Sequence, residues 1–439
     1  MLNRRAAQDI RDWVRSGTKP LIVTGARQVG KTFAVRETVT PLCRQLHLFN
    51  FEKQPSLAAI FAHDLHPLEI ISKLAIAINR DINLQQDIIF FDEIQACGQA
   101  LTSLKYFHED LPAAKIIATG SYIGLMQGFP VGKVATLEMF PLTFSEFLAA
   151  ILDSGPVFEA YRNSDYSPEA FKIIWPLLLE YFYVGGLPEV VSLWVQKRRV
   201  APVEGLGVVR SRLNELLNHY ILDFGKYAER NANHIVGLFN NIPYQLAQNI
   251  DSSVIKYKFK HVLPKKKSYA ELEGPLLWLE QMRMLHRSFI VKNPALPLIP
   301  SESIFKAFVF DMGILATQLN LSYTEIANAN FDYKGFVAEN FVALELKAAG
   351  MKKIHSWQSQ GDSEIEFLAP HPSGISIPIE VKSGKRTMAK SLETYRKMYR
   401  PPLAIKLVGS SGGTSGELRT LPLYYAERIP GLIATGSFS

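Results

Sequence analysis

The most constraining feature of this sequence is the run GARQVGKT at residues 25–32, which fits the pattern GxxxxGK[ST]. The run directly follows the apolar residues LIVT and precedes the amphipathic residues FAVRETV. In this order of strand, glycine-containing loop and helix, the pattern marks a phosphate-binding P-loop rather than a chance turn. The sequence therefore predicts an α/β domain built around a P-loop.

The predicted loop supplies groups for a nucleoside triphosphate and its magnesium ion. Gly25 and Gly30 let the backbone curl so that amide hydrogens point at phosphate oxygens, and the positive end of the following helix adds its field. Lys31 is expected to reach the β and γ phosphates, and Thr32 to give its hydroxyl to Mg²⁺. The predicted ATP-binding residues are Gly25, Ala26, Arg27, Gln28, Val29, Gly30, Lys31, Thr32 and Phe33.

An apolar strand that ends in two acids follows downstream, in the run DIIFFDE at residues 87–93. Adjacent residues on a strand point to opposite faces, so Asp92 and Glu93 can have different tasks. Asp92 is expected to hold Mg²⁺, and Glu93 to orient and polarise the water that attacks the γ phosphate. The same pattern alone also fits a solvated strand end, but its place after a P-loop favours the catalytic interpretation.

The run KIIATGS at residues 115–121 has polar residues at the carboxyl end of another apolar strand. Ligands bind at such ends in open α/β sheets. Thr119 or Ser121 is expected to sense the γ phosphate, and Ser121 is assigned a catalytic role beside Lys31 and Glu93. The alternative for Ser121 is a helix N-cap.

Short apolar runs alternate with longer amphipathic segments over residues 1–150: PLIVTG, QLHLFNF, DIIFFDEI and KIIATGS. This rhythm predicts a parallel sheet with crossover helices. The length of 439 residues exceeds what one core usually supports, so two or three domains are expected. We predict an α/β P-loop domain at 1–150, a helical lid or connector at 151–232, a winged-helix-like domain at 233–298 and a second α/β domain at 299–439.

The composition indicates in which cellular compartment the protein works and which partners it can bind. No run of apolar residues approaches the roughly 18 that span a bilayer, and Asp9 and Asp12 interrupt what a secretory signal would need. We therefore expect a cytoplasmic protein with no membrane partner. Cys43 and Cys97 are the only cysteines, which supports neither a disulfide framework nor a zinc site. A net charge of +7 permits a polyanionic partner and also fits a solvated basic surface.

Several segments together resemble the AAA+ ATPases, in particular prokaryotic ATP-binding proteins that pair an AAA+ domain with a C-terminal domain of unknown function. The matching segments are GARQVGKT, IIFFDEIQ, IIATGS, VGKVATLEMFPLTFSEFL, GGLPE, YILDFGKYA and FVAENFVALEL. Many such proteins have a glycine-arginine pair where this chain has Gly132-Lys133. The arginine finger is therefore unassigned. Arg210, Arg212, Arg230 or a residue of a neighbouring subunit is a candidate.

The middle of the chain reads as helical at a 3.6-residue period, with a break at Gly185-Gly186-Leu187-Pro188. Residues 234–292 are predicted to form helices, a basic segment, a longer helix and a strand. This order suggests a winged-helix variant. Lys265, Lys266 and Lys267 would then lie on a wing that contacts DNA, or they form an ordinary charged loop. The run GSSGGTSG at 409–416 is expected to be a flexible loop.

The last part of the chain is predicted to contain a helix with Glu339, a strand with Glu364 and Glu366, and a strand with Glu380 and Lys382. This order resembles the PD-(D/E)xK nuclease fold, in which strand acids bind magnesium and the lysine positions the attacking water. The resemblance implies a nuclease-like site at Glu339, Glu366, Glu380 and Lys382. Glu366 stands where an aspartate is more usual. The alternatives are a degenerate fold used for binding, or an interaction module on an ordinary half-buried strand.

Three functions follow from these patterns. The first is an ATP-hydrolysing switch that couples turnover to a DNA- or protein-binding C-terminal module. The second is an ATP-gated DNA endonuclease. The third is a DNA-binding or scaffolding protein in which ATP sets the oligomeric state with little turnover. The expected ligands are ATP, ADP and Mg²⁺, and the candidate partners are double-stranded DNA and further copies of the chain.

Overall fold

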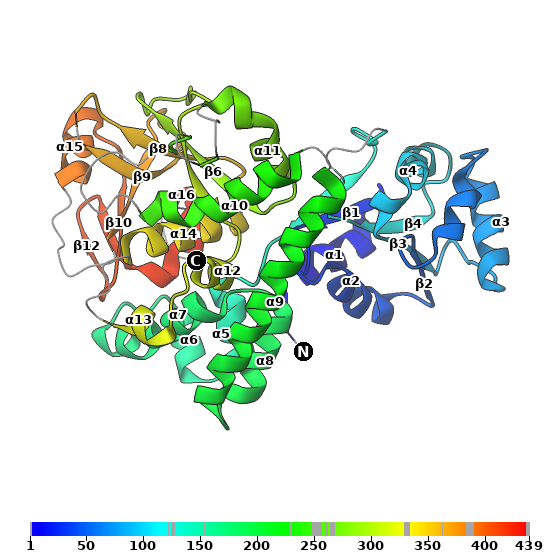
Figure 1. The fold of residues 1–439 in the computed structure, drawn as a ribbon, viewed down its shortest axis with the longest axis horizontal. Coiled ribbons are helices and arrows are strands. Elements are labelled where there is room, and N and C mark those ends of the chain that lie inside the picture. Colours follow the sequence, from blue (N-terminus) through cyan, green and yellow to red (C-terminus); the bar gives the residue numbers. More distant parts are fainter. Residues whose placement is uncertain are drawn as a thin grey trace. The chain divides into compact units, whose positions relative to one another are not determined.

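The computed structural model describes residues 2–121, 123, 128–152, 154–228, 231–247, 257–259, 262–263, 268–328, 334–361, 363–382 and 390–435 (Figure 1). The chain divides into two compact units, unit 1 (Met1–Phe140) and unit 2 (Pro141–Ser439). None of the helices found in the described residues combines the length and apolar composition needed to cross a membrane.

Unit 1 is built on a five-stranded sheet with the strand order β2-β3-β4-β1-β5, in which every pairing is parallel. The strands are β1 (Leu21–Gly25), β2 (Leu46–Asn50), β3 (Ile88–Asp92), β4 (Lys115–Thr119) and β5 (Ala135–Met139). The predicted parallel sheet is confirmed, and β1 to β4 coincide with the four apolar runs. The edge strand β5 was not expected from its sequence.

The helices of unit 1 are α1 (Ala6–Ser16), α2 (Lys31–Val39), α3 (Pro67–Ile78) and α4 (Gly98–Asp110), with the short 3₁₀ helices η1 (Thr40–Leu42), η2 (Pro55–Phe61) and η3 (Ile94–Ala96). One core joins α3, α4 and η2 to the sheet. Phe91 of β3 packs edge to face against Phe49, Phe51 and Phe61. Every residue of β3 is buried, which explains its unbroken apolar sequence.

Unit 2 begins with a helical layer and continues into a sheet covered by further helices. The helices are α5 (Phe144–Leu152), α6 (Pro156–Arg162), α7 (Pro168–Val184), α8 (Pro188–Arg198), α9 (Pro202–Ala228), α10 (Ala232–Ala247), α11 (Tyr269–Gln281), α12 (Met312–Gln318), α13 (Tyr323–Ala327), α14 (Lys334–Ala348), α15 (Lys390–Tyr399), η6 (Leu423–Arg428) and α16 (Ile429–Thr435). The predicted break between two helices is confirmed, since α7 ends just before Gly185 and α8 begins at Pro188.

The sheet of unit 2 has eight strands in the order β12-β13-β11-β10-β9-β8-β6-β7. They are β6 (Leu285–Val291), β7 (Phe305–Val309), β8 (Ile354–Gln358), β9 (Glu364–Ala369), β10 (Ile377–Lys382), β11 (Ala404–Val408), β12 (Gly413–Ser415) and β13 (Leu418–Pro422). The sheet mixes parallel and antiparallel pairs. Its strand β6 comes from the segment assigned to the winged-helix-like region, and it pairs with β8.

The prediction of a flexible loop over residues 409–416 was wrong for its second half. Residues Gly413–Ser415 form β12, which pairs antiparallel with β13. All three β12 residues are exposed, so the strand is held by backbone hydrogen bonds at the sheet edge rather than by buried side chains. A sequence of small residues carries no signal for such pairing.

Several later segments of the family resemblance meet in the interior of unit 2. Asp311, fully buried, accepts hydrogen bonds from the amides of Gly186 at 2.7 Å and Ile314 at 3.0 Å. The amide of Phe144 donates to Glu345 Oε1 at 3.1 Å. The side chain of Asn340 bonds to both backbone groups of Val309 on β7. These segments therefore have structural tasks, which explains why they characterise a fold without indicating a reaction.

Candidate functional site

The predicted P-loop lies between β1 and α2, as its sequence indicates. Gly25 has φ +149°, and a Cβ at this position would come within 2.2 Å of the carbonyl oxygen of Met139 on β5. Gly30 caps α2 with φ +87°, and Gln28 also has a positive φ of +66°. Left-handed conformations of this kind let successive backbone amides form a concave anion-binding site, as the P-loop pattern predicts.

The ammonium group of Lys31 lies buried inside the loop. Its Nζ donates to the carbonyl oxygens of Gly25 at 3.1 Å and Ala26 at 2.9 Å, and to Ser121 Oγ at 2.8 Å. Burial lowers the pKa of Lys31 to about 8, and the charge of Arg27 adds to this effect while Glu93 opposes it. The structure therefore brings together Lys31 and Ser121, which sequence analysis placed in one site.

Asp92 at the end of β3 is surrounded by donors. Its Oδ1 accepts from Thr32 Oγ1 at 2.8 Å and also from Thr119 Oγ1, and its Oδ2 accepts from Asn50 Nδ2 at 2.7 Å. A carboxylate beside a threonine hydroxyl at the head of a P-loop helix offers the oxygen ligands that Mg²⁺ prefers. Thr32 and Asp92 therefore fit the predicted metal-binding role. Thr119 contacts Asp92, whereas Ser121 contacts Lys31.

Glu93 follows Asp92 in the left-handed region, with φ +51°. Such a backbone conformation is uncommon for residues other than glycine and is found where function fixes a side chain. Gln95 Nε2 donates to Glu93 Oε2 at 2.6 Å. Burial raises the pKa of Glu93, although the hydrogen bond from Gln95 and the charge of Lys31 act against it.

Three residues at this site were missed by sequence analysis: Arg4, Asn50 and Gln95. Arg4 is buried and its guanidinium donates to the carbonyl oxygens of Val29 at 2.8 Å and Phe140 at 2.6 Å, so it ties the P-loop to the chain after β5. Asn50 ends β2, beside Asp92 on β3. The only sequence signal for Asn50 is a polar residue at the carboxyl end of a predicted strand, and Arg4 gave none.

Phe33, the last of the predicted nucleotide-binding residues, is about half exposed. It lines a hollow of about 360 Å³ between α1 and α2. Arg4, Glu37 and Leu42 also line this hollow. Neither Thr32 nor a residue of the loop 25–31 lines this hollow, so it gives no evidence about where the nucleoside end of a nucleotide would lie.

Comparison with known proteins agrees with this geometry. Residues 17–148 match the AAA domain family. This part of the chain is therefore similar to the AAA domain. Residues 176–325 and 334–418 match two domains of unknown function, DUF8612 and DUF4143. The chain matches no curated protein.

Solved structures with similarity to the chain include three ATPases or nucleotide-bound proteins. A Walker-type ATPase of Pyrococcus abyssi is 14% identical, with 73% of this chain and 96% of that chain covered and a TM-score of 0.42. AMPPCP-bound DnaA from Aquifex aeolicus is 12% identical over 64% of this chain and 88% of its own, with a TM-score of 0.30. A signal-transduction ATPase with numerous domains and a tetratricopeptide repeat sensor, from Pyrococcus horikoshii, is 13% identical over 79% and 45%, with a TM-score of 0.26.

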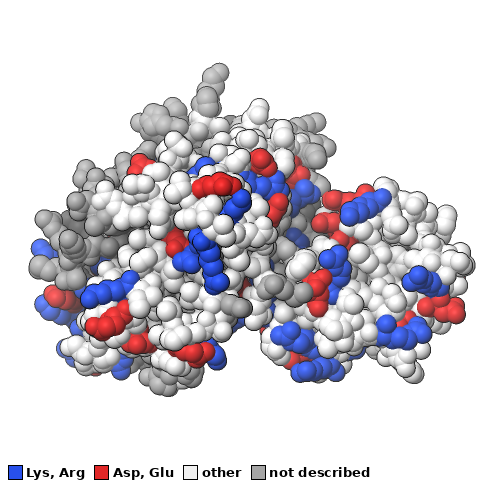
Figure 2. Space-filling model, turned by 90° about the horizontal axis from the view of Figure 1, so that it is seen from below, with Lys and Arg blue, Asp and Glu red and all other residues white. Residues whose placement is uncertain are grey.

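Two of the three arginine-finger candidates, Arg210 and Arg212, already have partners in unit 2. Arg210 donates to Thr317 Oγ1 at 2.6 Å and stacks over Tyr183. Arg212 pairs with Glu189 and Glu215. Arg230 lies outside the described residues, as do the predicted wing lysines 265–267. On the face shown in Figure 2, basic and acidic side chains of the described residues are interspersed, and no extended basic surface stands out.

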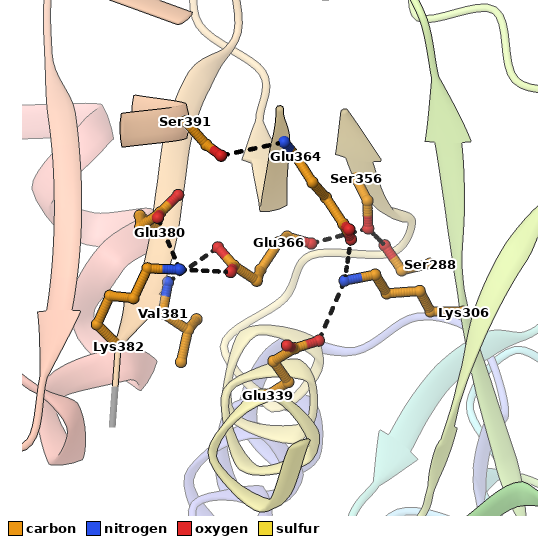
Figure 3. A network of polar contacts seen from close by, with 10 residues as sticks. All are labelled: Ser288, Lys306, Glu339, Ser356, Glu364, Glu366, Glu380, Val381, Lys382 and Ser391. Atoms are coloured by element: carbon orange, nitrogen blue, oxygen red, sulfur yellow. Dashed lines mark hydrogen bonds and ion pairs between the residues drawn. The ribbon is translucent and has the colours of Figure 1, made fainter. Parts of the chain in front are cut away.

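The C-terminal acids named by the nuclease resemblance lie close together in unit 2, but each of them is paired with a lysine (Figure 3). Lys382 Nζ lies 3.3 Å from Glu366 Oε1 and 2.8 Å from Glu380 Oε1. Glu339 pairs with Lys306 at 3.1 Å. Among the described residues, no group of three or more acidic, histidine or cysteine side chains is arranged to hold a metal ion. These residues therefore do not fit the magnesium site that a nuclease of this type requires.

The lowered pKa of Lys31 predicts a pH dependence of nucleotide binding. Only the ammonium form attracts phosphate, so above about pH 8 binding must be accompanied by proton uptake, and Kd should rise about tenfold per pH unit. Calorimetry with Mg-ATP in two buffers of different ionisation enthalpy measures that uptake. Lys31→Arg, which stays charged, should remove the pH dependence. If the unaltered protein binds Mg-ATP above pH 8 without taking up protons, the expectation is contradicted.

Proposed function

We propose that this protein binds Mg-ATP at the P-loop, hydrolyses it to ADP and phosphate, and uses the turnover as a switch acting on a DNA- or protein-binding module in unit 2. The observation that carries the proposal is the convergence of Lys31, Ser121, Thr32 and Asp92 at the carboxyl ends of β1, β3 and β4. This is the edge of an open α/β sheet at which ligands bind.

Different residues bind the phosphates, position the metal-binding carboxylate and activate water. The inward amides of residues 26–30 and the ammonium of Lys31 bind the phosphates, and Ser121 holds that ammonium in place. Asn50 and Thr119 fix the carboxylate of Asp92. Glu93 orients a water molecule and accepts its proton, a role for which its raised pKa makes it a stronger base.

Bound at Thr32 and Asp92, a magnesium ion supplies charge neutralisation for the phosphate oxygens. Cytoplasmic location, self-association and an arginine finger from a neighbouring copy remain predictions from sequence. The endonuclease alternative gains no support, because the acids that it needs are paired with lysines.

ATP hydrolysis by the purified full chain, with and without duplex DNA, tests the proposal. We expect turnover that depends on Mg²⁺, and a Lys31→Ala variant that binds ATP at least about tenfold more weakly because a charged donor to phosphate is lost. Stimulation by duplex DNA that falls as salt rises would identify DNA as the partner, whereas turnover indifferent to DNA points to a protein. Equal phosphate release by the unaltered protein and Lys31→Ala would refute the proposal.

A further inference from the structure

Six charged side chains form a largely buried cluster in unit 2, which we call the Lys306 cluster: Lys306, Glu339, Glu364, Glu366, Glu380 and Lys382 (Figure 3). They come from β7, α14, β9 and β10. The helix α14 packs against β6, β7, β8 and β10, so the strand acids lie beneath it rather than in solvent. The interpretation of β10 as an ordinary half-buried strand was wrong, because every residue of β10 except Lys382 is buried, including Glu380.

Lys306 is the most enclosed lysine of the cluster, with an exposed fraction of 1%. Its Nζ lies 3.1 Å from Glu339 Oε2 and forms a second ion pair with Glu364 Oε1. Burial alone would lower the pKa of Lys306, but the charges of Glu339 and Glu364 outweigh it, so the pKa is raised. The side chain is therefore a fixed positive charge between a helix and a strand.

The second lysine closes the other half of the cluster. Lys382 Nζ lies between Glu366 and Glu380, and the amide of Val381 donates to Glu366 Oε2 at 3.0 Å. Glu366 therefore directs one carboxylate oxygen at the backbone of β10 and the other at Lys382.

The cluster holds more acidic than basic side chains. Four carboxyl groups face two ammonium groups, so two further positive charges or two protons are needed. Burial raises the pKa of Glu339 to about 7, and burial together with the charge of Glu366 raises the pKa of Glu380 to about 8. The ion pairs with Lys306 and Lys382 act in the opposite direction, because each favours the ionised carboxylate. A charged group in such surroundings is stable only when it is paired in this way.

We propose that the Lys306 ammonium takes the place that a divalent cation would hold among these acids, so that the cluster is a metal-independent joint between β7, α14 and β9. Unit 2 then carries no metal-dependent nuclease chemistry at these residues. Removal of the lysine charge leaves oxygen ligands of the kind that hard divalent cations bind, and turns the joint into a metal site. This inference does not rest on ATP binding by the AAA domain.

The test compares the melting temperature of the nucleotide-free full chain with and without Mn²⁺ for the unaltered protein and for Lys306→Met, which keeps the aliphatic stem. We expect no shift for the unaltered protein. For Lys306→Met we expect a rise of roughly 3 to 5 °C at a metal concentration about 100 times Kd. Adding Glu339→Gln to Lys306→Met should abolish the rise.

Lys115→Met is the matched control, because Lys115 is also partly buried on a strand and its Nζ donates to the carbonyl oxygen of Gly17. It should show no response to Mn²⁺. A folded Lys306→Met protein without a metal response overturns the proposal, as does a Mn²⁺-dependent rise in the unaltered protein that Glu366→Gln removes. If Lys306→Met does not fold, Mn²⁺ titration of the unaltered protein decides. Mn²⁺ binding by the unaltered protein that is lost in Glu380→Gln would refute the proposal. The absence of Mn²⁺ binding by the unaltered protein would support it.

Discussion

Glu93→Gln is expected to lower the rate of ATP hydrolysis by about 10²- to 10⁴-fold while Mg-ATP still binds, the range that removal of a general base usually costs. Glutamine has nearly the shape of glutamate but cannot accept a proton. The phosphate-binding groups are unaffected, because Lys31 is held by Gly25, Ala26 and Ser121 rather than by Glu93. The variant should therefore accumulate in the ATP-bound state.

The local structure supports a large effect for this one residue. Glu93 is held in the left-handed region at φ +51° and is oriented by Gln95 at 2.6 Å. Buried surroundings raise its pKa, which favours proton transfer from water near neutral pH. A strained and oriented acid of this kind is costly to maintain for stability alone, so its loss should affect the chemical step rather than the fold.

Single-turnover hydrolysis and equilibrium binding of Mg-ATP separate the two quantities. Glu109→Gln is the matched control in the same unit, because the Glu109 carboxylate pairs with Lys133 at 2.9 Å, and it should keep the rate within about twofold. If Glu93→Gln hydrolyses ATP as fast as the unaltered protein, Glu93 is not the general base. If the unaltered protein hydrolyses ATP very slowly and Glu93→Gln hardly changes that rate, the result would instead favour a scaffolding protein in which ATP sets the oligomeric state.

Strands β1, β3 and β4 of unit 1 were predictable because at least four of the five residues in each are buried. The run IIFFD of β3 is buried at every position and reads as a continuous apolar strand. The run ATLEM of β5 is buried at Met139 only, so neither an apolar run nor strict alternation marks it. It joins the sheet through parallel pairing with β1, which is a long-range interaction that a local pattern does not contain.

The site was predictable only as far as its motifs extend along the chain. Lys31, Thr32 and Asp92 belong to patterns with a recognisable order of residue types. Arg4 reaches Val29 from the segment before α1, and Asn50 reaches Asp92 from the neighbouring strand. Their roles depend on which segments lie side by side, so a polar residue alone gave little indication of them.

Lys306 shows the same limit in unit 2. It stands alone in the apolar run FKAFV of β7, and its partners Glu339 and Glu364 lie far along the sequence. The sequence suggested a metal site because the acids are spaced as in a nuclease. The cation that pairs with Glu339 is supplied by a strand that the acidic motif does not include, so the pairing became visible only in three dimensions.

Gly186→Ala is expected to destabilise unit 2 by about 3 to 5 kcal/mol, because no space exists for even one added methyl group. A Cβ on Gly186 would lie 2.2 Å from the carbonyl oxygen and 2.7 Å from the amide nitrogen of Leu142. Both are backbone atoms, which cannot swing away as a side chain can. Moving the two segments apart would break the hydrogen bond from the Leu142 amide to the Gly186 carbonyl oxygen at 2.7 Å and the bond from the Gly186 amide to Asp311.

Gly207→Ala is the matched control within unit 2. Gly207 lies exposed in α9, and a Cβ there would meet no atom within 4 Å. This variant should be stabilised by about 0.5 to 1 kcal/mol, since alanine favours the helix more than glycine does. Chemical denaturation followed by tryptophan fluorescence reports mainly on unit 2, because every tryptophan except Trp13 lies there. Equal unfolding free energies for the two variants would show that the contact between Gly186 and Leu142 is not the constraint that fixes this glycine.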